Sequence, residues 1–355
     1  GGGCTWGQVD RTTAEYGRVV PSGIISTTGV GGLTLGGGLG HLTRRFGLTI
    51  DSLVSADVVL ADGSQVRADA GENADLFWAL RGGGGNFGVV TEFQFETHPL
   101  GATVMAGPTF WPIEQLPEVM AFYREFLPSA PRALNGFFAA MTVPPVDLFP
   151  PELHLRRVCA VVWCIVGTEP EAAALLAPVQ KVGTPLLHHV GPMPHPALQS
   201  LFDGLYTKGL QCYWRADFVN DLSDTLIERH REWAQRLPSM HSTMHLYPID
   251  GAAHDVGAGD TAFSYRDARW AEVIFGVDPD PARAADLRDW CVGYWDATHP
   301  YSAGGAYVNF MMEEGQERVR ATYRGNYDRL ARVKAQYDPD NVFAVNQNIR
   351  PAHLS

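Results

Sequence analysis

The sequence lacks the signatures of several large classes of protein. It has no Gly-x-x-x-x-Gly-Lys-Ser/Thr loop, no His-Glu-x-x-His pair and no Gly-x-Ser-x-Gly turn, which argues against P-loop nucleotide hydrolases, zinc proteases and α/β-hydrolases. It has no run of Lys and Arg, and its formal net charge is -12, so we expect no nucleic-acid partner. No apolar run approaches the length of a membrane span, so we expect no membrane partner and a soluble chain, with the cytoplasm as the favoured location.

Cysteine is scarce and scattered. The five cysteines are an odd number without the spacing of a disulfide framework, so we expect mostly buried free thiols. No arrangement of metal ligands stands out, and we expect no metal site. The positions are Cys4, Cys159, Cys164, Cys212 and Cys291.

What is present is the composition of a folded protein. Of its residues, 45% are apolar and 19% are charged. The length of 355 residues is more than one hydrophobic core usually supports. Before residue 100 glycine is abundant and the pattern is mixed. A hairpin is predicted over 54–69 around Asp62-Gly63, a helix over 73–81 and a strand over 89–96.

Beyond Pro99 the pattern changes to amphipathic helices that alternate with strands. Helices are predicted over 113–126, 223–237 and 281–298, and strands over 137–143, 158–167, 241–249 and 273–277. Such a series favours an α+β domain in which helices cover one face of an antiparallel sheet. One long helix is predicted over 315–338, ahead of a polar tail.

Two glycine-rich segments invite a nucleotide-binding interpretation. Residues 82–88 contain Gly-x-Gly-x-x-Gly, but a helix precedes them and a strand follows, which is the reverse of the dinucleotide-binding order. Glycine occupies more than half of residues 29–40, where it allows backbone N–H groups to approach an anion or a flat ring closely. Tight turns between strands are the alternative; we favour the approach of a ligand.

Several segments together resemble the berberine bridge enzyme-like branch of the vanillyl-alcohol oxidase superfamily, in its bacterial form. They are 23–32, 36–40, 45–51, 56–63, 75–91, 307–310, 326–330, 337–343 and 346–349. The resemblance implies FAD as cofactor, an α+β fold with an incomplete PCMH-type FAD-binding domain, and a substrate domain with an antiparallel sheet and covering helices. It divides the chain into FAD-binding residues 1–100, a substrate domain over 101–310 and a C-terminal segment over 311–355 that returns to the FAD domain.

The resemblance also implies residues that this sequence lacks. In the family an earlier Arg-x-Gly-Gly-His-type loop holds the pyrophosphate and carries the histidine linked to the flavin. That loop has no counterpart here, so we expect an N-terminally truncated member. Many members add a second covalent bond from a cysteine at the place of Ile25, which has no nucleophilic atom. The position that sets oxygen access is Thr28, where valine is common.

Tyr307 is the catalytic base that the resemblance implies. Tyr307 and Asn309 stand two apart in the strand-like stretch 306–310, which predicts that both side chains point to one face. An unperturbed phenol has a pKa of about 10, so a cation or the flavin has to favour its deprotonation; a packing tyrosine is the alternative. Tyr265 is the next candidate. The expected cofactor-binding residues are Gly29, Gly31, Gly32, Gly36, Gly37, Gly38, Gly40, Gly88, Val89, Val90, Asn309, Asn346 and Asn348.

The sequence therefore predicts an FAD-dependent enzyme with a small-molecule substrate. The expected reaction is oxidation of a hydroxyl group on a sugar, glycoside or natural product, with hydride transfer to flavin N5 and O2 as acceptor. Two alternatives stay open. One is a dehydrogenase that uses another acceptor, and the other is a flavin-free remnant that only binds a ligand.

Overall fold

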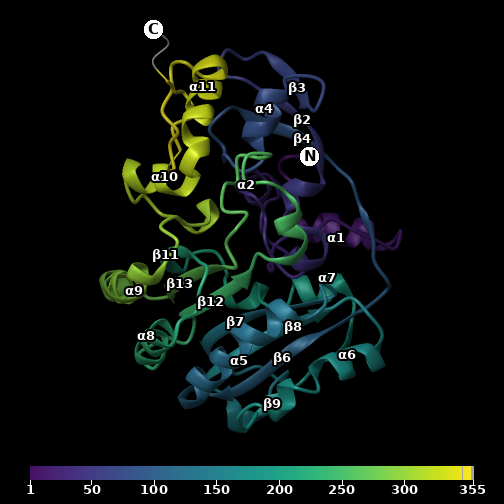
Figure 1. Cartoon of the computed structure of the whole chain (residues 1–355), viewed down its shortest axis with the longest axis vertical. Coiled ribbons are helices and arrows are strands. Elements are labelled where there is room, and N and C mark those ends of the chain that lie inside the picture. Colours follow the sequence, from purple (N-terminus) through teal and green to yellow (C-terminus); the bar gives the residue numbers. More distant parts are fainter. Residues whose placement is uncertain (346, 353–355) are drawn as a thin grey trace.

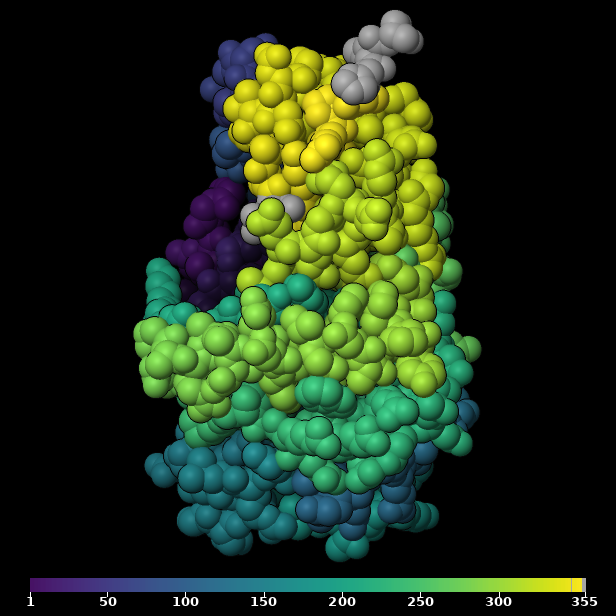
Figure 2. Space-filling view, turned by 90° about the vertical axis from the view of Figure 1, so that its left-hand side faces the viewer, coloured from purple at the N-terminus to yellow at the C-terminus, as the bar shows by residue number. Residues whose placement is uncertain are grey.

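The protein has two parts, which lie one above the other in Figure 1. The computed structural model describes residues 1–345 and 347–352. The upper part combines residues from both ends of the sequence, and the lower part is a large sheet with helices. Figure 2 shows the yellow C-terminal residues at the top beside blue residues from the first hundred, above a band of green and teal residues.

The predicted hairpin and its neighbours form a small antiparallel sheet in the upper part. The order is β3 (Gln65–Asp69), β2 (Leu53–Val59) and β4 (Val89–Phe95). The turn between β2 and β3 places Gly63 at φ +82°, a conformation that glycine adopts without strain. The predicted helix is α4 (Ala74–Leu80), which ends before the second glycine segment.

The N-terminal residues fold around the first glycine segment. They form α1 (Trp6–Ala14), β1 (Arg18–Val19) paired with β5 (His98–Pro99), α2 (Val30–Gly36), α3 (Thr43–Phe46) and the 3₁₀ turn η1 (Thr49–Ser52). Part of the glycine segment is thus a short helix, which neither interpretation of the sequence anticipated.

The lower part is an antiparallel sheet, as predicted. Its strand order is β10 (Gly191–Met193), β6 (Val104–Pro112), β8 (Arg157–Ile165), β7 (Leu134–Thr142), β12 (Thr243–Pro248), β13 (Trp270–Asp278) and β11 (Gln211–Val219), with β9 (Leu187–His188) also paired to β6. Three amphipathic helices pack on one face: α5 (Leu116–Ser129), α8 (Asp224–Ala234) and α9 (Ala284–Thr298). The short helices α6 (Glu169–Leu176) and α7 (His195–Gln199) lie in the connections. The other face is directed toward the upper part.

Alternation along the strands gives the sheet its two faces. On β12, Met244 and Leu246 pack under the covering helices, while His245 and Tyr247 belong to the opposite face. On β13, Ile274 lies under the helices and Val273 on the opposite face. The period of two therefore places every second side chain of these strands opposite the N-terminal residues.

Besides the short strands β1, β5, β9 and β10, the sequence prediction missed two long strands, β6 and β11. In β6, Gly107 has φ +136°, and a Cβ there would lie 1.9 Å from the carbonyl oxygen of His189. This glycine and the following Pro108 hide the strand pattern, because both residues are depleted in strands. In β11 the polar residues Arg215 and Asp217 interrupt the apolar alternation, although Asp217 is buried.

The predicted single helix over 315–338 is wrong, since the chain forms two helices there. They are α10 (Gln316–Tyr323) and α11 (Tyr327–Tyr337), separated by a 3₁₀ turn. Arg324 has φ +46°, and its guanidinium lies 3.4 Å from the ring centroid of Tyr265 and pairs with Asp267 at 2.6 Å. These contacts offset the strain of the left-handed backbone and hold the two helices at an angle.

A buried ion pair fastens α11 to the second glycine segment. The ammonium of Lys334 bonds to the Asp338 carboxylate and donates to the Asn86 carbonyl oxygen at 2.6 Å; both charged side chains are fully buried. Leu330 packs against Gly83, where a Cβ would lie 3.0 Å from its methyl carbon. The C-terminal residues therefore complete the core of the upper part.

Candidate functional site

A cavity of about 490 Å³ lies where the free face of the large sheet meets the N-terminal residues. Its size is within the range of small-molecule sites. One wall is the sheet, a second is the loop from Gly23 to Gly29 with the first turn of α2, and a third is the segment that carries Tyr307. No Asp, Glu, Lys or Arg is among the described residues that line it.

Aromatic side chains dominate the sheet wall. Tyr247 and His245 come from β12, Phe275 from β13 and Trp214 from β11, and Tyr206 approaches from the connection before β11. The indole N–H of Trp214 is buried and has no partner among the residues the structure describes, so it is available to a bound ligand. Sequence reasoning missed all five side chains; the alternation of β12 was the one signal that indicated a second face.

His245 and Tyr247 form a buried hydrogen-bonded pair in this wall. The His245 Nδ1 atom and the Tyr247 hydroxyl are 2.7 Å apart. Burial lowers the pKa of His245 to about 3 and raises the pKa of Tyr247 well above its ordinary value. Both side chains are therefore neutral at pH 7, so the cavity wall is polar without being charged.

Two glycines leave the loop wall open to the cavity. A Cβ at Gly29 or Gly32 would meet no atom within 4 Å, and both residues line the cavity. A flat ligand can therefore approach the loop backbone at these two positions. Ile25 and Thr28 line the same wall.

Tyr307 receives two hydrogen bonds at its phenolic oxygen. The Gly38 N–H donates to it at 2.8 Å and the Asn309 amide at 2.7 Å, and the side chain is buried. Burial raises the pKa of Tyr307 to about 12, even though the bonds from Gly38 and Asn309 act in the lowering direction. Because the two donors occupy the oxygen, the hydroxyl proton is directed elsewhere, and a phenolate formed there would be stabilised by both.

The predicted proximity of Tyr307 and Asn309 is confirmed, but the predicted strand is wrong. Residues 308–310 form a 3₁₀ turn, η9 (Val308–Phe310), with Tyr307 at its N-cap. The turn places the two side chains together because Asn309 folds back, with its amide donating to both Tyr307 and the Leu33 carbonyl oxygen. Gly36 makes room for this amide, since a Cβ there would lie 2.2 Å from the Asn309 side-chain oxygen.

The other glycines of the first segment contact the protein itself. A Cβ at Gly37 would lie 2.9 Å from the Phe263 ring, one at Gly38 2.0 Å from the Thr49 hydroxyl and one at Gly40 2.2 Å from the Ser22 carbonyl. A Cβ at Gly31 would lie 3.3 Å from the Gly2 carbonyl oxygen. Close internal packing thus accounts for these glycines, and they do not line the cavity.

Gly88, Val89 and Val90 lie at the small sheet, outside the cavity lining. A Cβ at Gly88 would lie 2.6 Å from Val58. Val90 is buried and Val89 is exposed. Their assignment to the cofactor stays a prediction.

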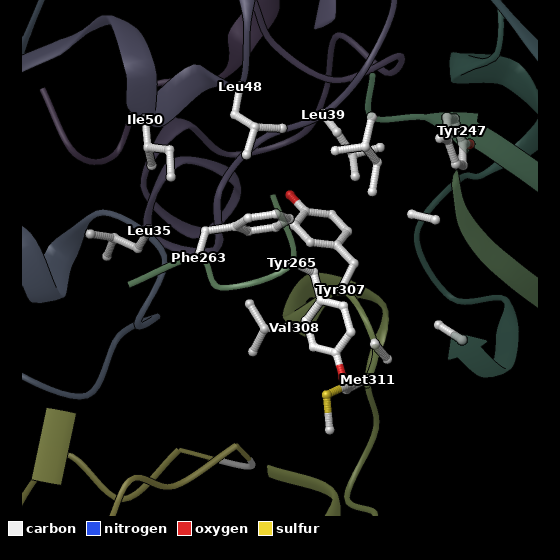
Figure 3. Close-up of a cluster of buried hydrophobic side chains, with 14 of the residues drawn as sticks. Leu35, Leu39, Leu48, Ile50, Tyr247, Phe263, Tyr265, Tyr307, Val308 and Met311 are labelled. Atoms are coloured by element: carbon white, nitrogen blue, oxygen red, sulfur yellow. The ribbon is translucent and has the colours of Figure 1, made fainter. Parts of the chain in front are cut away.

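Tyr265 is placed differently from Tyr307. Its hydroxyl donates to the Ala321 carbonyl oxygen at 3.0 Å, and its ring stacks on Phe218 at 4.4 Å. Figure 3 shows the two hydroxyls pointing in opposite directions, that of Tyr265 toward Met311. Tyr265 does not line the cavity, so it has the contacts of a packing residue rather than of a base.

The C-terminal amides serve contacts within the chain. Asn346 lies outside the described residues. Asn348 accepts a hydrogen bond from Gln316 at its carbonyl oxygen at 3.0 Å, and neither it nor Gln347 lines the cavity. The Gln347 amide donates to the Met311 carbonyl at 2.7 Å, and its own carbonyl accepts from Asn86 at 3.2 Å.

The cysteines lie outside the lining of the cavity. All five cysteines are free, as expected, but Cys212 is exposed and Cys4 is partly exposed. Neither residue lines the cavity.

Within the described ranges, no helix has the length and apolar character needed to cross a membrane.

A cavity between an open glycine wall and an antiparallel sheet, with an oriented tyrosine, fits the class of flavin-dependent oxidoreductases. Comparison with known proteins agrees. Residues 1–69 match the family model for an FAD binding domain, and residues 306–350 match the one for berberine and berberine-like proteins.

The alignments with individual relatives cover nearly the whole chain. The uncharacterized FAD-linked oxidoreductase YgaK of Bacillus subtilis (strain 168) is 32% identical over 99% of this chain and 77% of its own length. The glucooligosaccharide oxidase of Sarocladium strictum is 27% identical over 94% of this chain and 70% of its own length. The solved structure of the wild-type BBE-like 1 protein of Physcomitrella patens has a TM-score of 0.87 and 22% identity, over 99% of this chain and 77% of that one.

The chain belongs to the berberine bridge enzyme-like FAD-linked oxidoreductases. Its cofactor is FAD, and its residues fit that group at the cavity: Gly29 and Gly32 are open to a flat ring, and the Trp214 N–H is an unpaired donor among the described residues.

Proposed function

We propose that this enzyme oxidises a hydroxyl group of an uncharged small molecule, a sugar, glycoside or related natural product. The observation that supports this most is the Tyr307 hydroxyl, which lines the cavity and accepts hydrogen bonds from Gly38 and Asn309. Bound FAD supplies the hydride acceptor, which is flavin N5. The residues that would hold its ring system are the open glycines Gly29 and Gly32, with Asn309 at the edge of the cavity.

Tyr307 acts as the general base in this proposal. Removal of hydride from a carbon is favoured when the hydroxyl group on that carbon loses its proton. The phenolic oxygen of Tyr307 accepts that proton. Tyr307 must first release its own proton to water, because its raised pKa of about 12 makes the neutral phenol the resting form. The N–H groups of Gly38 and Asn309 then stabilise the phenolate, since hydrogen bonds to a charged group are stronger than those to a neutral one.

The lining of the cavity supports an uncharged substrate. The described residues that line it include no Asp, Glu, Lys or Arg, and His245 is neutral because burial lowers its pKa to about 3. A charged substrate would therefore lose its hydration without gaining an ion pair. The hydroxyl of Tyr247 is a neutral hydrogen-bonding group suited to a substrate hydroxyl. A sugar substrate is also consistent with the printed activity of the glucooligosaccharide oxidase relative.

We propose O2 as the electron acceptor. Thr28 lines the cavity and is close in volume to the valine common at that position in the family, so it leaves similar space. Hydrogen peroxide formed in step with substrate consumption is the expected result. Turnover with a dye acceptor but without peroxide would instead favour the dehydrogenase alternative.

The test of the catalytic proposal compares two tyrosines in the FAD-loaded protein. Tyr307→Phe removes only the hydroxyl in the cavity, and the rate of anaerobic flavin bleaching by substrate should fall by about 10²- to 10⁴-fold. Tyr265→Phe removes a hydroxyl that faces backbone carbonyls, and it should leave that rate unchanged. Reoxidation by O2 should be similar in both variants. Bleaching of Tyr307→Phe at the wild-type rate would refute the base assignment.

A further inference from the structure

A second, smaller cavity lies on the same face of the large sheet. It has a volume of about 160 Å³. Its lining is almost entirely apolar and includes Phe110, Met141, Phe149, Val162, Leu201 and Leu205. An apolar cavity of about this size accommodates a benzene ring.

The two cavities lie over the same β-sheet. The strand order places β6, β8 and β7 under the small cavity and β12, β13 and β11 under the large one, within a single sheet. Phe137 of β7 stands between them. Its ring centroid lies 5.9 Å from that of Phe202, which lines the small cavity, and 5.1 Å from that of Tyr247, which lines the large one.

One segment of chain also forms a wall of both. Residues 201–205 contribute four side-chain or backbone positions to the small cavity, and the next residue, Tyr206, lines the large one. Asp203 fastens this segment to the glycine-rich loop, because its carboxylate accepts from the Ser26 N–H at 3.0 Å and from the Ser26 hydroxyl at 2.5 Å. The segment that lines both cavities is therefore held in place by the loop that lines the large one.

The rim of the small cavity is apolar and open to water. Val146 and Leu148 line it with 43% and 44% of their surfaces exposed. Exposed apolar side chains that continue into an apolar cavity are typical of a ligand-binding groove, whereas isolated ones are common on any surface.

We propose that the small cavity is the subsite for an apolar, ring-sized part of the substrate. The substrate class is then an amphiphilic compound, such as a glycoside with an aromatic aglycone, whose hydroxyl-bearing end occupies the Tyr307 cavity. A free oligosaccharide is disfavoured as an occupant of both cavities, because its hydroxyls would find no partners against Phe110, Val162 and Leu205. This inference rests on the proposed function only for the end that is oxidised.

The test is calorimetric binding to the FAD-loaded protein. 2-Naphthyl β-D-glucoside should bind at least about tenfold more tightly than methyl β-D-glucoside, because its ring leaves water. Leu148→Asp should remove most of that difference and leave methyl glucoside binding unchanged. Leu155→Asp is the matched control, since Leu155 is an exposed leucine of the same connection that does not line the cavity.

Equal affinity for the two glucosides, or equal effects of the two aspartate variants, would overturn the subsite. Tighter binding of cellotriose than of naphthyl glucoside would overturn the substrate class. Failure of the proposed function looks different: naphthyl glucoside would bind in the manner expected, sensitive to Leu148→Asp, yet would not bleach the flavin in the absence of oxygen.

Discussion

The side-chain amide of Asn309 donates a hydrogen bond to the phenolic oxygen of Tyr307 at 2.7 Å. The same amide donates to the Leu33 carbonyl at 3.0 Å, which fixes its orientation. Asn309 therefore links the segment that carries the proposed base to α2, the helix that contains Gly32 of the glycine wall.

Asn309→Asp should slow flavin reduction by about 10- to 100-fold near neutral pH. A carboxylate cannot donate to Tyr307, and its charge opposes a phenolate, so the pKa of Tyr307 rises and less of it is deprotonated. The rate should increase with pH in the wild type and in the variant, with the variant's profile displaced to higher pH. Anaerobic stopped-flow at several pH values measures this.

Asn326→Asp is the control for that measurement, because the Asn326 amide donates to the Ala258 carbonyl at 2.7 Å, away from the cavity. Superimposable pH profiles of Asn309→Asp and the wild type would show that the amide does not tune Tyr307.

No covalent flavin should be found on the loop that contains Ile25. Its side chain lines the cavity but has no nucleophilic atom, and none of the five cysteines lines that cavity. Mass spectrometry of a digest of the FAD-loaded protein should return the peptide 21–44 at its unmodified mass. A flavin adduct within that peptide would contradict the prediction.

Glu272→Gln should flatten the dependence of stability on pH. Burial, together with the nearby Asp217, raises the pKa of Glu272 to about 8. The folded protein then binds more protons than the unfolded chain between about pH 4.5 and pH 8. Stability from this group is present at low pH and is lost as the pH rises through that window, by up to about 1.4 kcal/mol per pH unit.

Urea unfolding of the wild type and of Glu272→Gln at pH 5, 6, 7 and 8 measures the difference. Asp10, whose pKa burial raises to about 7, contributes in the same direction and is present in both proteins. Glu228→Gln, at an exposed pair with Arg231, serves as the control. Parallel pH profiles for the wild type and Glu272→Gln would exclude Glu272 as the source.

Lys334→Met should lower the free energy of unfolding by about 3–5 kcal/mol, because it leaves the Asp338 charge buried without its partner. It also removes the donor to the Asn86 carbonyl. Denaturant unfolding measures the loss. Arg231→Met, which breaks an exposed pair with Glu228, should change stability little.

The double variant Lys334→Met/Asp338→Leu should recover part of the lost stability, since no lone charge remains in the core. A single variant as stable as the wild type would show that the pair is dispensable.

Local patterns predicted much of this fold. The hairpin of β2 and β3 followed from one Asp-Gly pair between alternating strands, and α4, α5, α8 and α9 followed from their apolar periodicity. The break at Arg324 could not be predicted, because its left-handed backbone is held by Tyr265 and Asp267, which are distant in sequence. Strand β6 was hidden by Gly107, whose conformation depends on the approach of His189.

The site was also predictable only in part, because several of its contacts join residues that are distant in sequence. Tyr307 and Asn309 were found through their motif, while their contact arises from a 3₁₀ turn rather than a strand. The local sequence does not distinguish the glycines at 36, 37, 38 and 40, which pack against the protein itself, from glycines that a ligand approaches. Trp214 and Tyr206 enter the cavity through strand pairing and a long connection, and neither is visible in a local pattern.

The bond from Gly38 to Tyr307 joins residues that are 269 positions apart. During synthesis the glycine wall emerges long before its tyrosine, and the residues that fasten α11, from Lys334 to Asp338, follow later still. The cavity therefore cannot assemble until the residues through Asp338 have been made, and the apolar surface of the N-terminal residues stays uncovered until then. Contacts of this range form slowly, so translation that stalls before Tyr307 should yield chains that depend on chaperones.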